Sequence, residues 1–124
     1  MNINVRDSCG NTALHWVTKN GMLAETRVLL GSPGIDVNAV DERGYTALQQ
    51  MAMSSRKVNI PVLQALLSHP DINVNALQHG NITCLHMAIH LRKIEMVRLL
   101  VARPDTNVNL PFNGEHNLHT AGVT

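Results

Sequence analysis

The sequence predicts an all-α solenoid, in which stacked helix-turn-helix pairs are joined by short β-hairpin loops. Three observations lead to this prediction. The chain contains three segments that align with one another, each segment holds two short helical patterns, and polar turn sequences separate the segments. Self-similarity at a fixed period of about 20–50 residues is the signature of a repeat protein. We therefore expect residues 1–124 to form a single repeat domain.

The three aligned segments are residues 7–40, 41–77 and 78–110. Thr12, Thr46 and Thr83 occupy the same place in each segment, 34 and then 37 residues apart. From the matching leucine to the matching asparagine, the second segment spans 27 steps and the other two span 24, so it carries three extra residues. The insertion falls in the polar run from Ser54 to Asn59. Such a polar run between two apolar patterns is typical of a loop. The period therefore predicts one structural unit per segment.

Partial repeats flank the three segments. Residues 1–6 align with the last part of a repeat, and residues 111–124 align with the beginning of a fourth. Terminal repeats need a polar outer face to be soluble, and the sequence shows no such cap at the C-terminus. We therefore expect the chain to be a piece of a longer array. The alternative is that a partner or self-association covers the uncapped C-terminal face.

Each segment carries two apolar patterns with helical spacing. In the third segment, Leu85 and Ala88 belong to the first pattern, and Met96 and Leu100 belong to the second. A spacing of three or four residues places such side chains on one helix face. Helices of about two or three turns are marginal alone, because helix nucleation is unfavourable. In the second segment, Asn59 is suited to cap a helix whose first turn contains proline. Stacking of neighbouring pairs would bury both faces.

Polar turns begin each segment, at residues 7–11, 41–45 and 78–82. In the first two, aspartate is followed three residues later by glycine, a composition typical of a hairpin tip. We expect these tips to project from the same edge of the stack.

The strings TALHWV, TALQQM and TCLHMA, beginning at Thr12, Thr46 and Thr83, resemble the T-P-L-H-x-A signature of the ankyrin repeat. The resemblance covers nearly the whole chain. It departs from the family at the proline, which is alanine or cysteine here, and at Gln49, which replaces histidine. Arg92 also stands where the first repeat has a glycine, so we expect a less relaxed turn there.

The resemblance implies binding of another protein along a concave surface, formed by the hairpin tips and the exposed side of each first helix. Carried over to this chain, that surface comprises Ser8, Asn11, Lys19, Asn20, Glu42, Arg43, Tyr45, Met53, His79, Ile82, His90 and Leu91. Arg43, Tyr45, Met53 and Leu91 are the expected hot spots, because tyrosine and arginine are enriched among them. Trp16 either flanks this surface or is buried.

The resemblance leaves the function open among three hypotheses. The chain is an interaction module of a larger scaffold, regulatory or effector protein. A second hypothesis is a self-standing inhibitor of a kinase or a transcription factor, and a third is an enzyme or a metal-binding protein. The resemblance also implies that Asn38 and Asn75 correspond to sites that are hydroxylated in some eukaryotic ankyrin repeats.

Composition argues against several classes of function. The net charge is +1, and the chain has one Trp, one Tyr and one Phe, so neither a basic field nor an aromatic platform for nucleic acid is expected. No apolar run approaches the roughly 20 residues of a membrane span. Two cysteines are too few for a secreted disulfide framework. We expect an intracellular protein, cytoplasmic or nuclear.

The sequence predicts no catalytic, cofactor or metal site. His86 and His90 would share a helix face and His79 and His119 could lie near, but Cys84 and its neighbours do not form the tight ligand pattern of a zinc site. The resemblance implies instead that His15, His86 and His119 bond backbone groups between neighbouring repeats. Cys9 and Cys84 are expected to be free thiols, with Cys9 exposed at a hairpin tip and Cys84 at a tolerant position. Met51, Met87 and Met96 are expected in the core.

Overall fold

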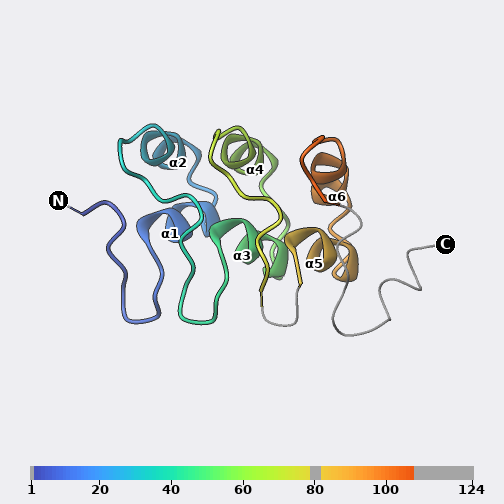
Figure 1. Cartoon of the computed structure of the whole chain (residues 1–124), viewed down its shortest axis with the longest axis horizontal. Helices are drawn as coiled ribbons and strands as arrows, with labels where there is room; N and C mark the ends of the chain where they lie inside the picture. Colours follow the sequence, from blue (N-terminus) through green and yellow to red (C-terminus); the bar gives the residue numbers. More distant parts are fainter. Residues whose placement is uncertain (1, 79–81, 108–124) are drawn as a thin grey trace.

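A computed structural model describes residues 2–78 and 82–107 (Figure 1). This part of the chain forms six α-helices: α1 (Ala13–Lys19), α2 (Leu23–Leu30), α3 (Ala47–Met53), α4 (Ile60–Leu67), α5 (Cys84–His90) and α6 (Ile94–Val101). Helices α1, α3 and α5 form one row, the inner helices, and α2, α4 and α6 form a second row, the outer helices. The predicted all-α stack of helix pairs is confirmed. None of these described helices has the length and apolarity to cross a bilayer.

Each inner helix is preceded by a threonine, its N-cap residue, that forms a capping box. The hydroxyls of Thr12, Thr46 and Thr83 accept the backbone N–H three residues later, and that residue's side chain accepts the threonine N–H in return. His15 Nδ1 accepts the Thr12 N–H at 3.0 Å, and Gln49 Oε1 accepts the Thr46 N–H at 2.9 Å. Two unpaired helix donors are thereby satisfied at each start. Glutamine is therefore an effective substitute for the signature histidine.

The same side chains also reach the following repeat. His15 Nε2 lies 3.0 Å from the Tyr45 carbonyl oxygen, and Gln49 Nε2 donates to the Ala76 carbonyl at 2.8 Å. The inter-repeat role that the family resemblance implied is thus present for His15. His119 lies outside the described residues. Each of these side chains couples a helix start to its neighbour, so local and inter-repeat order depend on one group.

A ladder of asparagines links the loops that follow the outer helices. Asn4, Asn38 and Asn75 stand at equivalent places, and each side chain both donates to and accepts from the next repeat. The partners, at 2.7–2.9 Å, are Gly34 O and Asp36 N for Asn4, Asp71 O and Asn73 N for Asn38, and Asp105 O and Asn107 N for Asn75. The bidentate bond keeps successive repeats in register.

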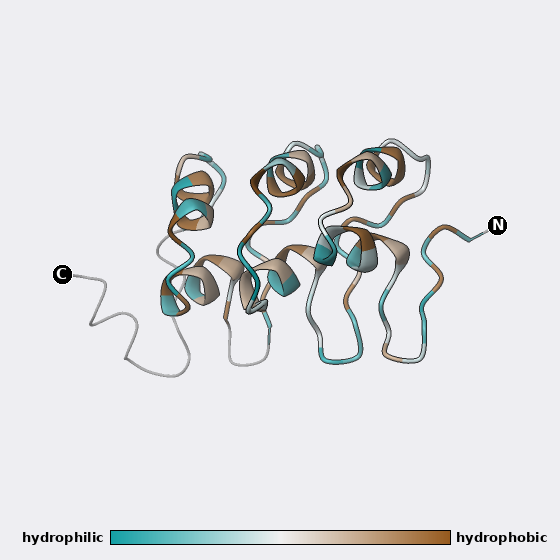
Figure 2. Ribbon diagram, turned by 180° about the vertical axis from the view of Figure 1, so that it is seen from behind, coloured by the Kyte–Doolittle hydropathy of each residue, from teal (hydrophilic) through white to brown (hydrophobic). Residues whose placement is uncertain are grey.

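The core lies between the two rows of helices. Its largest fully buried apolar side chains are Leu14, Leu48, Leu63, Leu66, Met96 and Leu100. Met51, Met87 and Met96 are buried, as predicted. Figure 2 shows the hydrophobic residues gathered on the helices, whereas the tip of the second hairpin is hydrophilic. Burying one leucine contributes roughly 1.5–3 kcal/mol, and two-turn helices depend on this contribution.

The connectors between paired helices differ in length. Residues 20–22 join α1 to α2 and residues 91–93 join α5 to α6, whereas residues 54–59 join α3 to α4. Gly21 and Arg92 have positive φ angles of 69° and 61° at matching places in the short connectors. A left-handed conformation disfavours any residue with a Cβ, so the less relaxed turn expected at Arg92 is present. Asn59 caps α4 through a 3.2 Å bond to the Val62 N–H, as predicted.

Candidate functional site

The second hairpin tip is organised around Asp41. Its backbone N–H donates to the Tyr45 carbonyl at 2.9 Å, and its Oδ1 accepts the N–H groups of Arg43 and Tyr45, both at 2.9 Å. Burial alone would raise the pKa of Asp41, but hydrogen bonds from Tyr45, Gln50 and Arg43 together hold it below its ordinary value. The ionised carboxylate therefore fixes the shape of the tip.

Successive tips are joined into a continuous rim. The Glu42 N–H donates to the Cys9 carbonyl at 3.1 Å, and Gln50 Nε2 donates to Asn11 Oδ1 at 2.8 Å. The close approach requires glycine at position 10, because a Cβ on Gly10 would lie 2.5 Å from the Glu42 nitrogen. The first two tips therefore form one rigid wall. In the third tip, Gln78 and Ile82 form an antiparallel bridge.

A cavity of about 580 Å³ lies between this rim and the inner helices, and we term it the tip groove. It is lined by Cys9, Asn11, Lys19, Asp41, Glu42, Arg43, Tyr45, Gln50, Met53, Ser54, Ser55 and Arg56. Two repeats contribute its walls, so the groove exists only when they stack. The second connector closes it at one end.

The tip groove presents an aromatic ring, a guanidinium and a thioether together. The Arg43 guanidinium carbon lies 5.1 Å from the centre of the Tyr45 ring, within the range of a cation–π contact. The Met53 side chain, at the end of α3, is 44% exposed, and Lys19 is exposed at the end of α1. Such mixed apolar and cationic surfaces are typical of binding hot spots.

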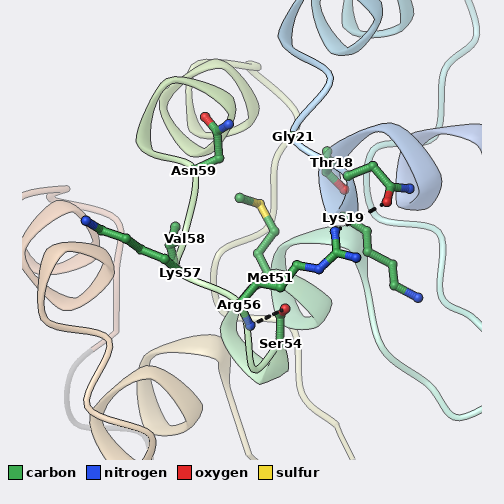
Figure 3. Close-up of a pocket in the computed structure, with 10 residues that line it drawn as sticks. Thr18, Lys19, Gly21, Met51, Ser54, Arg56, Lys57, Val58 and Asn59 are labelled. Atoms are coloured by element: carbon green, nitrogen blue, oxygen red, sulfur yellow. Dashed lines mark hydrogen bonds between the residues drawn. The ribbon is translucent and has the colours of Figure 1, made fainter.

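A second, smaller cavity of about 180 Å³ lies between the first two connectors (Figure 3). It is lined by Thr18, Lys19, Asn20, Gly21, Met51, Ser54, Arg56, Lys57, Val58 and Asn59. The Arg56 side chain extends across it, with Nη1 3.4 Å from Asn20 Oδ1. The ammonium of Lys93 donates to the carbonyls of Ser54 and Arg56 from the other side. The long connector is therefore held by both neighbouring repeats.

The structure divides the predicted surface residues among several places. Those lining the tip groove are Asn11, Lys19, Glu42, Arg43, Tyr45 and Met53. Asn20 lines the connector cavity, and Ser8 is exposed on the first tip outside both cavities. His90 and Leu91 are exposed at the end of α5. Ile82 is half-buried against the core, and His79 lies outside the described residues. Predicted residues of the first two repeats therefore line the two cavities, whereas Ile82, His90 and Leu91 of the third repeat line neither.

Gln50 and Arg56 are among the groove residues that the predicted surface did not include. Gln50 stands in the same register as Trp16, so its position on the helix pointed to the groove wall. Arg56 belongs to the insertion, which the sequence showed only as a polar turn. Trp16 itself is neither buried nor in the groove lining: it is exposed, its Nε1 donates to Asp7 Oδ2 at 2.9 Å, and the Lys19 ammonium lies 5.7 Å from its ring centre.

The two cysteines are free and differ in environment. Cys9 is exposed, as expected. Cys84 is only 1% exposed, its thiol donates to the Val74 carbonyl at 3.3 Å, and burial raises its pKa to about 12. The expectation of a tolerant position is therefore wrong, because this side chain fills part of the core. Among residues 2–78 and 82–107, no cluster of three His, Cys, Asp or Glu side chains is arranged to hold a metal ion.

Comparison with known families agrees with this geometry. The family pattern described as "Ankyrin repeats (3 copies)" matches residues 1–78, and that described as "Ankyrin repeat" matches residues 80–111. The chain belongs to the ankyrin-repeat family. Ankyrin repeats are generally non-enzymatic modules that bind other proteins, so the partner of this chain is expected among proteins.

Curated relatives share this repeat region. An ankyrin repeat-containing protein of Schizosaccharomyces pombe is 31% identical over 98 residues, which is 79% of this chain and 42% of the relative. The SMC5-SMC6 complex localization factor protein 1 of Homo sapiens is 30% identical over 82% of this chain and 9% of its own length. An ankyrin repeat protein of fowlpox virus is 30% identical over 77% of this chain and 28% of its own length. The chain thus spans less than half of each of these relatives.

Proposed function

We propose that this ankyrin-repeat chain binds a partner protein through the tip groove. The observation that supports the proposal is the joint presentation of Arg43, Tyr45 and Met53 in a groove formed by two hydrogen-bonded repeats. A preformed surface loses less conformational freedom on binding than a loop that must first become ordered. The groove residues are therefore the specificity residues of the proposed interaction.

We further propose that this chain acts as one module of a larger intracellular scaffold, regulatory or effector protein. The small share of each relative that the chain spans supports the modular role. The two free thiols support a reducing compartment.

The experiment is an affinity pull-down with purified chain, comparing wild type with the Arg43→Ala/Tyr45→Ala variant. We expect proteins retained by wild type to be lost from the variant, because truncation of such anchors costs roughly 2 kcal/mol or more each. Arg27→Ala/Val28→Ala on α2 is the matched control, since both side chains are exposed on an outer helix. Partners that the control loses equally, or that the groove variant retains, would contradict the proposal. Unchanged urea unfolding of both variants would show that the fold is intact.

A further inference from the structure

Charge is segregated along the stack. Residues 8–24, 43–70 and 72–94 contain no aspartate or glutamate, and these ranges hold the inner helices and all three connectors. Basic residues gather where each inner helix ends: Lys19, Arg56, Lys57, Arg92 and Lys93. We term residues 19–22, 54–59 and 90–93 the connector edge. The edge therefore carries five formal positive charges and no negative charge of its own.

The connector edge is one continuous surface. Arg56 bonds the Asn20 side chain of the first connector, and Lys93 of the third connector bonds backbone carbonyls of the second. Figure 3 shows Arg56 extending toward the first repeat and Lys57 pointing away from it, toward the third. The partners of Lys93 are neutral carbonyls, so its charge adds to the field. The long connector thus bridges the basic residues of its two neighbours.

Ordinary helix electrostatics does not account for this cluster. A helix C-terminus favours a cation in its last turn, which explains Lys19 at the end of α1. Arg56 and Lys57 lie beyond α3, in the segment that the second repeat has in addition. The Lys57 side chain is exposed. Helix electrostatics alone therefore does not explain Arg56 and Lys57.

The acidic residues of the described chain lie elsewhere. They occupy the first two tips, the first turns of α2 and α6, and the loops after the outer helices: Asp7, Asp41, Glu42, Glu25, Glu95, Asp36, Asp71 and Asp105. Glu95 lines a cavity with Lys57 and Lys93 and is bonded to Arg98 at 3.0 Å, and Glu42 shares the tip groove with Lys19 and Arg56. Asp41 in the adjoining groove is saturated by hydrogen bonds. The five cations of the edge therefore outnumber the acidic side chains at its border, which are Asp41, Glu42 and Glu95.

We propose that the connector edge binds an acidic segment of the partner protein, beside the part of that partner held in the tip groove. The inference rests on the proposed function, since both surfaces would serve one partner. Two exposed apolar side chains, Met53 and Leu91, at 44% and 42% exposure, flank the cations. They favour an acidic peptide with apolar residues over nucleic acid, whose phosphates gain nothing from them and whose bases need aromatic platforms. The inserted connector supplies the central charges and is the specificity element of this edge.

The test is selection of a random peptide display library on the purified full chain. We expect the selected peptides to be enriched in aspartate and glutamate relative to the unselected library. Their binding, measured by fluorescence anisotropy, is expected to fall roughly tenfold or more in Arg56→Glu/Lys57→Glu and to weaken at high salt, because each reversal replaces attraction with repulsion. Both substitutions leave the backbone bonds of the connector in place. Urea unfolding checks that the variant is folded.

The matched control is Arg6→Glu/Arg27→Glu, which changes the net charge equally at two exposed positions outside the connector edge. An equal loss in this control would overturn the proposal, as would failure to select peptides or selection without acidic enrichment. Tighter binding of a single-stranded DNA oligonucleotide than of the selected peptides would also overturn it. Peptides that require Arg43 and Tyr45 but tolerate Arg56→Glu/Lys57→Glu would reject the acidic edge and leave the proposed function standing.

Discussion

At the scale of single residues, an imidazole in the first repeat and an amide in the second perform the same structural role. His15 and Gln49 each accept a threonine N–H and reach a carbonyl of the following repeat. Histidine can gain a proton near neutral pH, whereas glutamine cannot. His15 is buried, and burial lowers its pKa below the ordinary value of 6.5, against smaller raising effects of Tyr45 and Asp41. The stability of the first repeat therefore depends on pH through His15, whereas Gln49 adds no such dependence to the second.

The variant His15→Gln tests this difference. As pH falls through 6.5, the unfolded histidine binds its proton before the folded one, so the unfolded state is favoured. The stability from neutral His15 is complete above that pH and declines below it. We expect urea unfolding of wild type to weaken between about pH 7.5 and 5.5 by more than that of His15→Gln. Other titrating groups cancel in the comparison. Parallel pH curves for the two proteins would show that His15 is not responsible.

At the scale of elements, the two short connectors place a left-handed residue at the same point. The first uses Gly21 and the third uses Arg92. A left-handed conformation costs a non-glycine residue about 1–2 kcal/mol. Glycine avoids this cost, but it lowers stability by about 0.4–1 kcal/mol because it gives the unfolded chain more conformational freedom. The third connector is therefore the strained one.

Arg92→Gly is expected to raise the free energy of unfolding by about 0.5–1 kcal/mol, the difference between these two effects. The measurement is the urea midpoint, with an unchanged dependence on denaturant. Gly21→Ala is the reciprocal variant and should destabilise, because its Cβ would also lie 2.9 Å from Asn59 Nδ2. A lower urea midpoint for Arg92→Gly would mean that the arginine side chain stabilises the fold by more than its left-handed backbone destabilises it.

The elements were predictable where their determinants are local. Threonine followed by histidine or glutamine at the third place marks the start of each inner helix, and Asn59 with a following proline marks α4. The contacts that shape the candidate site are not local. Arg56 reaches Asn20 and Lys93 reaches Ser54, across 36 and 39 residues of sequence. No periodicity encodes such contacts, so the insertion could be located but its two neighbours could not.

At the scale of the whole molecule, side-chain placement depends on which neighbour is present. Trp16 and Gln50 share a register, yet Gln50 joins Asp41 to Asn11 of the preceding tip, whereas the Trp16 indole donates to Asp7 of its own tip. The helical pattern of one repeat gives the same prediction for both residues. The contact of Gln50 with Asn11 comes from the neighbouring repeat, which the pattern of the second segment alone does not specify. A solenoid is stabilised by nearest neighbours, and the place of a repeat in the stack is information that no single segment contains.

Nearest-neighbour stabilisation makes a prediction about cooperativity. Leu63 in α4 and Leu100 in α6 are both fully buried, so replacement by alanine costs each about 2–5 kcal/mol. Leu63 lies in the middle pair, whose loss would separate the other two, whereas loss of the third pair leaves the first two in contact. Hydrogen exchange should therefore accelerate in all six helices of Leu63→Ala. In Leu100→Ala it should accelerate chiefly in α5 and α6. Equal acceleration of exchange in α1 and α2 of the two variants would contradict this prediction. It would show that the described helices unfold as one unit, without the partial opening that nearest-neighbour coupling allows.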